Sequence, residues 1–328
     1  MVRISIADSE DSFEIDEGDT ILRAALRAGY GMPYSCNVGS CGNCKFTLVE
    51  GNVAHLRKDA PAMSERDLKR QKWLGCQALP DGDCTIKFRA DPEFISLYKP
   101  TQNFAKLVSV HQITRDISEF RFTKDGPEGF LPGQYALLNF LGVEGGRPYS
   151  MCNLPDDGYW SFQIKKVLDG AATTELFNLQ IGTMITIDGP YSTAFLREDV
   201  PRDIILIAGG SGLSPMVSIA RQVEATQFLS TRKVHFYYGC REEADLFNPS
   251  DLPHPMSNDI SFVAALSNTS HGHHRKGFLH QIVAADFPKT LKDHEIYFAG
   301  PSIMSAAIQK MAYEAGVSMK QLHFDEFF

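Results

Sequence analysis

Four cysteines have a spacing that suits an iron-sulfur cluster. Three of them stand in the stretch CNVGSCGNCKF, separated by four and then two residues, and the fourth follows after a long gap. This order is that of one class of 2Fe-2S site, whereas zinc ligands usually occur as two short knuckles. Two glycines in the loop permit turns that point amide N–H groups at negatively charged sulfides. The alternative interpretation of the cysteines is a structural zinc site. The cysteines with this spacing are Cys36, Cys41, Cys44 and Cys76.

The segment RPYSMCN contains the groups that a flavin needs. Arg147 is a fixed cation that can form forked hydrogen bonds to a diphosphate, and Tyr149 offers an aromatic plane for the isoalloxazine ring. Ser150 supplies a hydroxyl that can reach N5 of that ring, and Pro148 lies between the cation and the tyrosine. An arginine and a tyrosine on the surface of a barrel are the alternative interpretation.

A glycine and a threonine three residues later open a helix-like stretch in QIKKVLDGAATTELF. Gly170 and Thr173 would then stand at a helix N-terminus, where amide N–H groups bind phosphate, and Thr174 is an equally suitable hydroxyl. Together with Arg147 on the other side, this helix start could hold the diphosphate of FAD. An ordinary helix cap is the alternative.

Three strand-like runs in the last third of the chain end at small residues, as in a dinucleotide-binding sheet. The first is RDIILIAGGSGLSPM, and the others are KVHFYYGCR and EIYFAGPSIM. The strict GxGxxG is absent, but the carboxyl ends of parallel strands meet at one edge, where backbone amides can approach a pyrophosphate. A glycine turn that merely packs is the alternative. The glycines of the first turn are Gly209, Gly210 and Gly212.

Composition limits the class of protein. The chain has 328 residues, a net charge of -8 and seven cysteines, which argues against a nucleic-acid-binding protein and against a disulfide framework. Its N-terminus lacks the basic and apolar segments of a secretory signal, and no apolar run reaches the length of a membrane span. We therefore expect a cytoplasmic protein of two or three domains, without a nucleic-acid or membrane partner.

Hydrophobic periodicity divides the chain into four parts. Residues 1–92 alternate like short strands around one helical stretch, and residues 93–102 form an irregular linker. Residues 103–200 contain short alternating strands between glycine and proline turns, which predicts an antiparallel barrel. Residues 201–328 repeat the pattern of a doubly wound parallel sheet. The expected fold class is multidomain, α/β plus β.

The order of motifs resembles the ferredoxin-NAD reductase family in its oxygenase-partner branch, across essentially the whole chain. The order runs cluster loop, RxYS, GxxT, GGSG, YYGCR and AGP, and the tail LHFDEFF is most similar to the toluene monooxygenase type of reductase component. The resemblance implies a β-grasp, plant-type ferredoxin domain, an antiparallel Greek-key β-barrel for FAD and a parallel-sheet domain for NAD. It assigns the four cysteines as iron ligands. It also assigns cofactor contacts to Arg147, Tyr149, Ser150, Gly170, Thr173, Gly209, Gly210, Gly212, Gly300, Pro301 and, over the flavin face, Phe327.

Two positions depart from the family pattern. Ala299 stands where many relatives have a cysteine near the nicotinamide, and Cys240, at the neighbouring strand end, could occupy that pocket or be a buried spectator. Asp325 replaces a glutamate of many relatives, which leaves its flavin contact open. Both departures lie where the family places the reacting rings.

The cofactor set predicts the chemistry. NADH gives up two electrons as a hydride, a 2Fe-2S cluster accepts one, and only FAD handles both, so no side chain has to act as a general acid or base. We expect a monomeric, NADH-dependent reductase that donates electrons to a ferredoxin, Rieske-type or other, or to the oxygenase component of an aromatic or hydrocarbon oxygenase. The alternatives are the reductase of a sugar dehydratase, a redox-sensing module without turnover, and a flavin reductase with structural zinc.

Charged segments give further expectations. Arg241 could accept a 2′-phosphate, but Glu242 and Glu243 beside it would repel one, which favours NADH over NADPH. Residues 8–19 hold seven acids and no base, so they form either a solvated turn or a surface that steers a basic acceptor. The three histidines of SHGHHRKG, which are His271, His273 and His274, indicate an exposed loop, and a metal site is the alternative.

Overall fold

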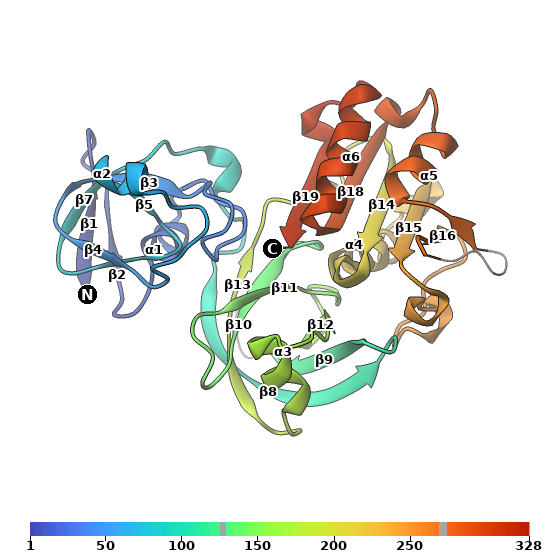
Figure 1. The fold of residues 1–328 in the computed structure, drawn as a ribbon, viewed down its shortest axis with the longest axis horizontal. Coiled ribbons are helices and arrows are strands. Elements are labelled where there is room, and N and C mark those ends of the chain that lie inside the picture. Colours follow the sequence, from blue (N-terminus) through green and yellow to red (C-terminus); the bar gives the residue numbers. More distant parts are fainter. Residues whose placement is uncertain (125–128, 269–273, 328) are drawn as a thin grey trace.

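The computed structural model describes residues 1–124, 129–268 and 274–327, which form three units in chain order (Figure 1). His271 and His273 of the predicted histidine loop lie outside these ranges. No helix within the described ranges is long and apolar enough to cross a bilayer.

The N-terminal unit is a five-stranded sheet with one long helix packed across it. The strand order is β2-β1-β7-β3-β5, in which β1 runs parallel to β7 and the other pairs are antiparallel. Helix α1 is amphipathic, and its Ile21 and Leu22 share a hydrophobic core with Ile4 and Phe13 of the sheet. A separate pair, β4 and β6, lies beside this sheet. The elements are β1 (Val2–Ile6), β2 (Ser12–Ile15), α1 (Ile21–Ala28), β3 (Lys45–Glu50), β4 (Val53–His55), α2 (Glu65–Lys69), β5 (Lys72–Leu74), β6 (Ala78–Pro80) and β7 (Cys84–Lys87).

The middle unit is a six-stranded sheet that curls into a barrel. Its order is β11-β10-β13-β8-β9-β12, and every pair is antiparallel. The two edges meet at an antiparallel bridge between Met151 and Phe162 and at a hydrogen bond of 2.8 Å from Cys152 N to Ser161 O. The elements are η1 (Pro92–Phe94), β8 (Thr101–Gln112), β9 (Ile117–Thr123), β10 (Tyr135–Asn139), β11 (Arg147–Ser150), β12 (Tyr159–Lys165), α3 (Ala171–Asn178) and β13 (Met184–Tyr191).

The C-terminal unit is a parallel sheet with helices on both faces. Its order is β17-β16-β15-β14-β18-β19. Successive residues of β14 point to opposite faces, so Leu206 packs in one core with Val217 of α4 and Ile205 in another with Ile308 of α6. The elements are β14 (Asp203–Gly209), η2 (Gly210–Gly212), α4 (Leu213–Ala225), η3 (Phe228–Ser230), β15 (Val234–Cys240), η4 (Glu243–Asp245), η5 (Pro249–Asp251), β16 (Ser261–Leu266), β17 (Arg275–Lys276), α5 (Leu279–Asp286), η6 (Leu291–Asp293), β18 (His294–Pro301), α6 (Ser302–Glu314), η7 (Met319–Gln321) and β19 (Leu322–Phe327).

The three units pack directly on one another. Tyr135 of the barrel belongs to the hydrophobic core of the N-terminal unit. Helix α4 of the C-terminal unit reaches the barrel, because Ser214 Oγ donates to Ser150 O at 2.6 Å and Ser218 Oγ donates to Asn153 O at 3.0 Å. Strand β19 ends at the centre of the molecule, where the units meet (Figure 1). The predicted antiparallel barrel and doubly wound parallel sheet are confirmed.

Candidate functional site

The sheet of the N-terminal unit brings the distant cysteine to the cysteine loop. Cys44 directly precedes β3, Cys76 follows β5 after one residue, and β3 and β5 pair side by side. Between them, Gly75 N donates to Cys44 O at 2.9 Å. A Cβ on Gly75 would lie 3.2 Å from Cys44 O, which is tighter than ordinary van der Waals contact, so a glycine eases the close approach of the two segments.

The four thiols form two close pairs. A hydrogen bond from the Cys41 thiol lowers the pKa of Cys36 to about 5, and the same contact raises the pKa of Cys41. Cys44 and Cys76 interact likewise, which raises the pKa of Cys44 and lowers that of Cys76. Two pairs suit a cluster of two irons that is bound by four thiolates.

Backbone amides of the loop surround the Cys36 sulfur. The N–H groups of Val38, Ser40 and Cys41 lie 3.5, 3.3 and 3.3 Å from Cys36 Sγ. Gly39, with φ 83°, supplies a left-handed turn that aims them inward. Such donors stabilise negative charge on sulfur, so the loop fits a 2Fe-2S cluster.

A small cavity, of about 20 Å³, lies where the cluster loop, the barrel and the C-terminal strand meet. Ser150 lines it, and Ser150 Oγ is buried without a hydrogen-bond partner among the described residues. A buried hydroxyl without a partner costs free energy, so this atom fits the predicted contact with a flavin ring. The cavity is lined by Ser35, Cys36, Tyr135, Pro148, Ser150, Asp325, Glu326 and Phe327.

Arg147 and Tyr149 alternate with the cavity residues along β11. Because successive side chains of a strand point to opposite faces, they lie opposite Pro148 and Ser150. Arg147 is half-buried, and its Nη1 donates to two backbone carbonyls of the preceding loop at 3.0 and 2.9 Å. Tyr149 packs against the barrel core, and burial raises its pKa to about 12. The strand therefore presents its hydroxyl to the cavity and its cation to the rim of the barrel.

The start of helix α3 differs in detail from the predicted phosphate site. Thr173 is buried, and its hydroxyl donates to Val167 O and Gly170 O at 3.2 and 3.1 Å. Thr174 is exposed in the first turn of the helix. The hydroxyl that a ligand can reach is therefore that of Thr174, while Thr173 closes the turn.

The glycine turn after β14 packs tightly against the end of β18. A Cβ on Gly212 would lie 1.8 Å from Ala299 O, and a Cβ on Gly209 would lie 2.4 Å from Met304 Sδ. Gly212 is therefore required by packing against backbone, whatever ligand it meets, whereas the Met304 side chain beside Gly209 can move. Gly210 is not enclosed in this way, because a Cβ there would meet nothing closer than 4.0 Å; its φ of 54° is the feature that favours a glycine.

The C-terminal strand connects the carboxyl edge of the parallel sheet to the cavity. Strand β19 follows β18 as far as Gly300 and Pro301, with Phe327 opposite Pro301. Phe327 also lines the cavity together with Ser150. The predicted dinucleotide edge and the predicted flavin contact are thus neighbours.

Cys240 lies at the end of β15, next to β14 on the same edge. The thiol is half-buried, and Sγ donates to Glu242 O at 3.3 Å. Burial raises its pKa to about 12, which keeps the thiol neutral and unreactive at neutral pH.

Asp325 is half-buried, lines the cavity and is bonded to a strained serine. Ser192 Oγ donates to both carboxylate oxygens of Asp325, at 3.0 and 2.8 Å, and Ser192 N donates to Tyr34 Oη at 2.8 Å. Ser192 has φ 98°, a region that residues with side chains rarely adopt, and these bonds hold it there. Burial raises the pKa of Asp325 to about 7. One serine thus links the C-terminal strand, the barrel and the N-terminal unit.

Two further contacts fix the cluster loop to the barrel. Tyr135 Oη donates to Ser35 O at 2.6 Å, directly before Cys36 in the chain. Arg27 Nη2 pairs with Asp188 Oδ1 at 2.7 Å. None of these residues belongs to a short motif, and the partners are 100 and 161 residues apart, so the sequence offered no signal for them.

Three family models match the chain in order. They are a 2Fe-2S iron-sulfur cluster binding domain at residues 4–81, an oxidoreductase FAD-binding domain at 104–195 and an oxidoreductase NAD-binding domain at 206–310. Ferredoxin–NAD(P)(+) reductase CarAd of Metapseudomonas resinovorans is 36% identical, over 95% of this chain and 95% of that protein. The ferredoxin–NAD(+) reductase component of the alkene monooxygenase system of Xanthobacter autotrophicus is 33% identical, over 96% and 98%. The chain belongs to the reductase components of multicomponent oxygenase systems.

A solved structure supports the same assignment. The reductase superposes with a TM-score of 0.92 on the ferredoxin reductase in carbazole 1,9a-dioxygenase, which is 34% identical, over 100% of this chain and 98% of the other. The xylene/toluene monooxygenase electron transfer component XylA of Pseudomonas putida is 29% identical, over 99% and 93%. The predicted family, fold class and cofactor set, which consists of 2Fe-2S, FAD and NAD, are confirmed.

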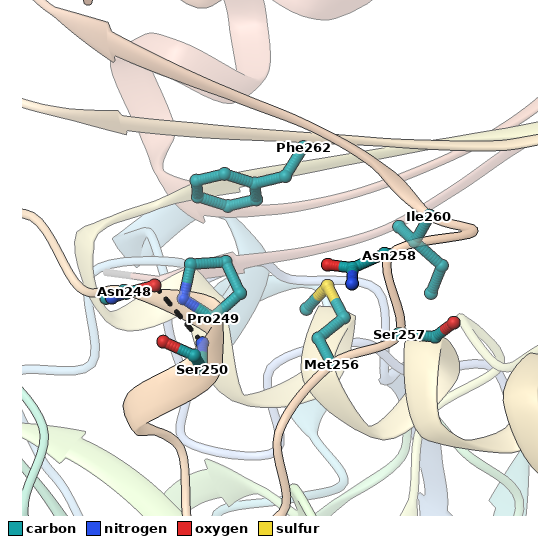
Figure 2. A pocket seen from close by; sticks show the side chains of 8 residues that line it. All are labelled: Asn248, Pro249, Ser250, Met256, Ser257, Asn258, Ile260 and Phe262. Atoms are coloured by element: carbon teal, nitrogen blue, oxygen red, sulfur yellow. Dashed lines mark hydrogen bonds between the residues drawn. The ribbon is translucent and has the colours of Figure 1, made fainter.

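The reductase also has a larger cavity, of about 450 Å³, far from these motifs (Figure 2). It lies at the start of β16, the opposite end of the parallel sheet from the glycine turns. Figure 2 shows the Asn248 side chain turned back to Ser250 N, a bond of 3.2 Å, and no lysine or arginine lines the space. It therefore does not suit a pyrophosphate. Its lining is Asn248, Pro249, Ser250, Met256, Ser257, Asn258, Ile260 and Phe262.

Proposed function

We propose that this reductase oxidises NADH and delivers single electrons to a ferredoxin or to the oxygenase component of an aromatic or hydrocarbon oxygenase system, acting as a cytoplasmic monomer. The observation that carries the proposal is the cavity in which Cys36, Ser150 and Phe327 meet. When bound, FAD accepts a hydride and the 2Fe-2S cluster carries one electron at a time. The chain itself supplies position, hydrogen bonds and exclusion of water.

Each group around the cavity has a separate task in this proposal. Ser150 Oγ, buried and unpartnered among the described residues, hydrogen-bonds the flavin ring, and Phe327 covers the ring from the C-terminal strand. Arg147 at the barrel rim and the α3 N-terminus at Gly170 hold the diphosphate, with Thr174 as the accessible hydroxyl. The four cysteines hold the cluster.

Two observations support the finer assignments. Relatives are named for alkene monooxygenase and naphthalene 1,2-dioxygenase systems, which favours an oxygenase-type acceptor over a sugar dehydratase or a module without turnover. Glu242 and Glu243 are exposed beside Arg241 at the end of β15, where a 2′-phosphate would approach. Their charge supports NADH as the donor.

The test is a pair of cysteine substitutions. Cys41→Ser removes one cluster ligand. NADH-driven reduction of a small dye that takes electrons directly from the flavin should therefore persist, while reduction of a c-type cytochrome is lost. Cys84→Ser is the matched control, because that buried thiol donates only to Asn52 O and Gly82 O, each at 3.3 Å, and it should leave both rates unchanged. Cytochrome reduction by the Cys41 variant at the wild-type rate would contradict the proposal.

A further inference from the structure

The cluster loop has one side against the barrel and one side toward solvent. Ser35 and Cys36 face the cavity that Tyr135 and Ser150 line, so this side is occupied by the rest of the chain. On the other side Asn43 is exposed and Cys41 is half-buried. An external partner that takes an electron from the cluster therefore approaches from the solvent side.

The solvent side is bordered by residues 57–72, which connect β4 to β5. Ala62 N donates to Gly39 O at 3.2 Å, and a Cβ on Gly42 would lie 3.4 Å from the Ala62 side chain. Helix α2, within this segment, is joined to the ligand loop by an ion pair of 3.0 Å between Asp67 and Lys45, the residue after Cys44. The segment is thus the immediate neighbour of the cluster site.

This segment is basic, although the chain is acidic. It contains six lysines and arginines against three acids, a balance of +3 in a chain whose net charge is -8. Asp59 pairs with Arg57, and Asp67 is held by Lys45. The remaining cations are exposed and form no ion pair among the described residues; they are Lys58, Arg66, Lys69, Arg70 and Lys72.

The acidic run lies at the opposite edge of the same sheet. Residues 8–19 comprise the turn before β2, β2 itself and the segment that leads from β2 to α1. Strand β2 is one edge of the order β2-β1-β7-β3-β5, and β5 is the other. Four strand spacings separate the edges, roughly 19 Å. Because the Debye length is about 10 Å at 0.1 M salt, the two charged regions act independently in solution. The ligands Cys44 and Cys76 adjoin β3 and β5, so the charge beside the cluster is positive.

We propose that residues 57–72 form the docking face for an acidic one-electron acceptor, such as a ferredoxin with carboxylates around its redox centre. The inference rests on the proposed function and deepens it, because it names the charge of the partner. It reverses the steering suggested by the acidic run, which would attract a basic acceptor. Complementary charge raises the association rate more than the affinity, and salt screens it.

The test compares two probes of opposite charge at an ionic strength of about 0.1 M, where the two edges of the sheet are screened from each other: an acidic plant-type 2Fe-2S ferredoxin and a basic c-type cytochrome. The variant Arg66→Gln/Lys69→Gln/Arg70→Gln keeps the α2 capping box of Ser64 and Asp67. We expect transfer to the ferredoxin to slow about tenfold, transfer to the cytochrome to accelerate, and both rates to converge with wild type at high salt.

The matched control neutralises the opposite edge with Asp8→Asn/Glu10→Gln/Asp11→Asn, and it should change either rate by less than about twofold. An unchanged ferredoxin rate in the basic-face variant at about 0.1 M salt would overturn the docking face. A larger loss of ferredoxin reduction in the control than in the basic-face variant would overturn it too. NADH-driven dye reduction by the wild-type protein separates the proposed function from the docking face. A wild-type protein that does not reduce the dye would refute the proposed function, and it would leave the docking face to the comparison of the variants.

Discussion

Tyr135→Phe should loosen the attachment of the cluster loop to the barrel without unfolding either unit. The tyrosine hydroxyl is buried and donates to Ser35 O at 2.6 Å, and the substitution removes only that oxygen. The Tyr34–Ser192 and Arg27–Asp188 contacts remain. The variant therefore weakens one of three polar contacts across this interface.

The magnitude follows from the cost of leaving the carbonyl of the half-buried Ser35 unpaired. A hydrogen bond contributes about 1 kcal/mol net, and a buried acceptor left without a partner costs about 1–3 kcal/mol. We take about 2 kcal/mol for Ser35 O, which raises the ratio of undocked to docked N-terminal unit by roughly 30-fold. The rate of electron transfer to a protein acceptor should fall only in proportion to the decrease in the docked fraction. The opening equilibrium of the loop should rise by the whole factor of roughly 30.

Two assays separate these effects. Deuterium exchange of the amides at residues 34–36 should accelerate by roughly 30-fold, and NADH-driven dye reduction should stay at the wild-type rate. Tyr30→Phe is the matched control, because Tyr30 Oη donates to Ser12 O at 3.2 Å inside the N-terminal unit and bridges no interface. Equal exchange in wild type and Tyr135→Phe would refute the view that this bond holds the loop.

Three further predictions concern the cavity and the nucleotide. Ser150→Ala should slow NADH oxidation at least about tenfold while the melting temperature of the FAD-free protein does not fall, because Ser150 Oγ has no partner among the described residues to lose. Burial raises the pKa of Asp325 from 3.8 to about 7. The contribution of the protonated carboxyl to folding stability is therefore fully present below about pH 4 and is lost as the pH rises through 7. Asp325→Asn should therefore stabilise the FAD-free protein at pH 8, by at most about 4 kcal/mol, and not at pH 4, as measured by urea unfolding. Glu242→Gln/Glu243→Gln should raise kcat/KM for NADPH several-fold and leave that for NADH within twofold; an unchanged NADPH value would remove charge repulsion as the basis of selectivity.

Features that depend on local spacing could be predicted from the sequence. The cysteine spacing predicted the cluster site, because three of the four thiols belong to one loop. The apolar run at β14 predicted a strand covered on both faces, and Ile205 and Leu206 do pack into different cores. Composition and turn residues sufficed for the barrel and the parallel sheet.

Features that depend on the phase of a turn or on long-range pairing could not be predicted. Thr173 and Thr174 are chemically alike, and only the turn geometry decides that Thr173 is buried while Thr174 is exposed. The bond from Tyr135 to Ser35 joins two units 100 residues apart. The charge beside the cluster depends on which strands form the edges of the sheet, and the sequence does not reveal this order. The acidic run of residues 8–19 is therefore conspicuous in the sequence, although the basic segment of residues 57–72 lies nearer the cluster.

Stopped-flow mixing of the reductase, with FAD and cluster bound, with NADH in the absence of oxygen and acceptor shows whether electrons pass from flavin to cluster within one molecule. In this protein one chain places its cluster loop against its own cavity, through Cys36, Ser150 and the C-terminal strand. The absorbance bands of the flavin and of the iron-sulfur cluster should both bleach, and the rate of cluster bleaching should not depend on protein concentration. A cluster that stays oxidised, or one that bleaches at a rate proportional to protein concentration, would contradict the account.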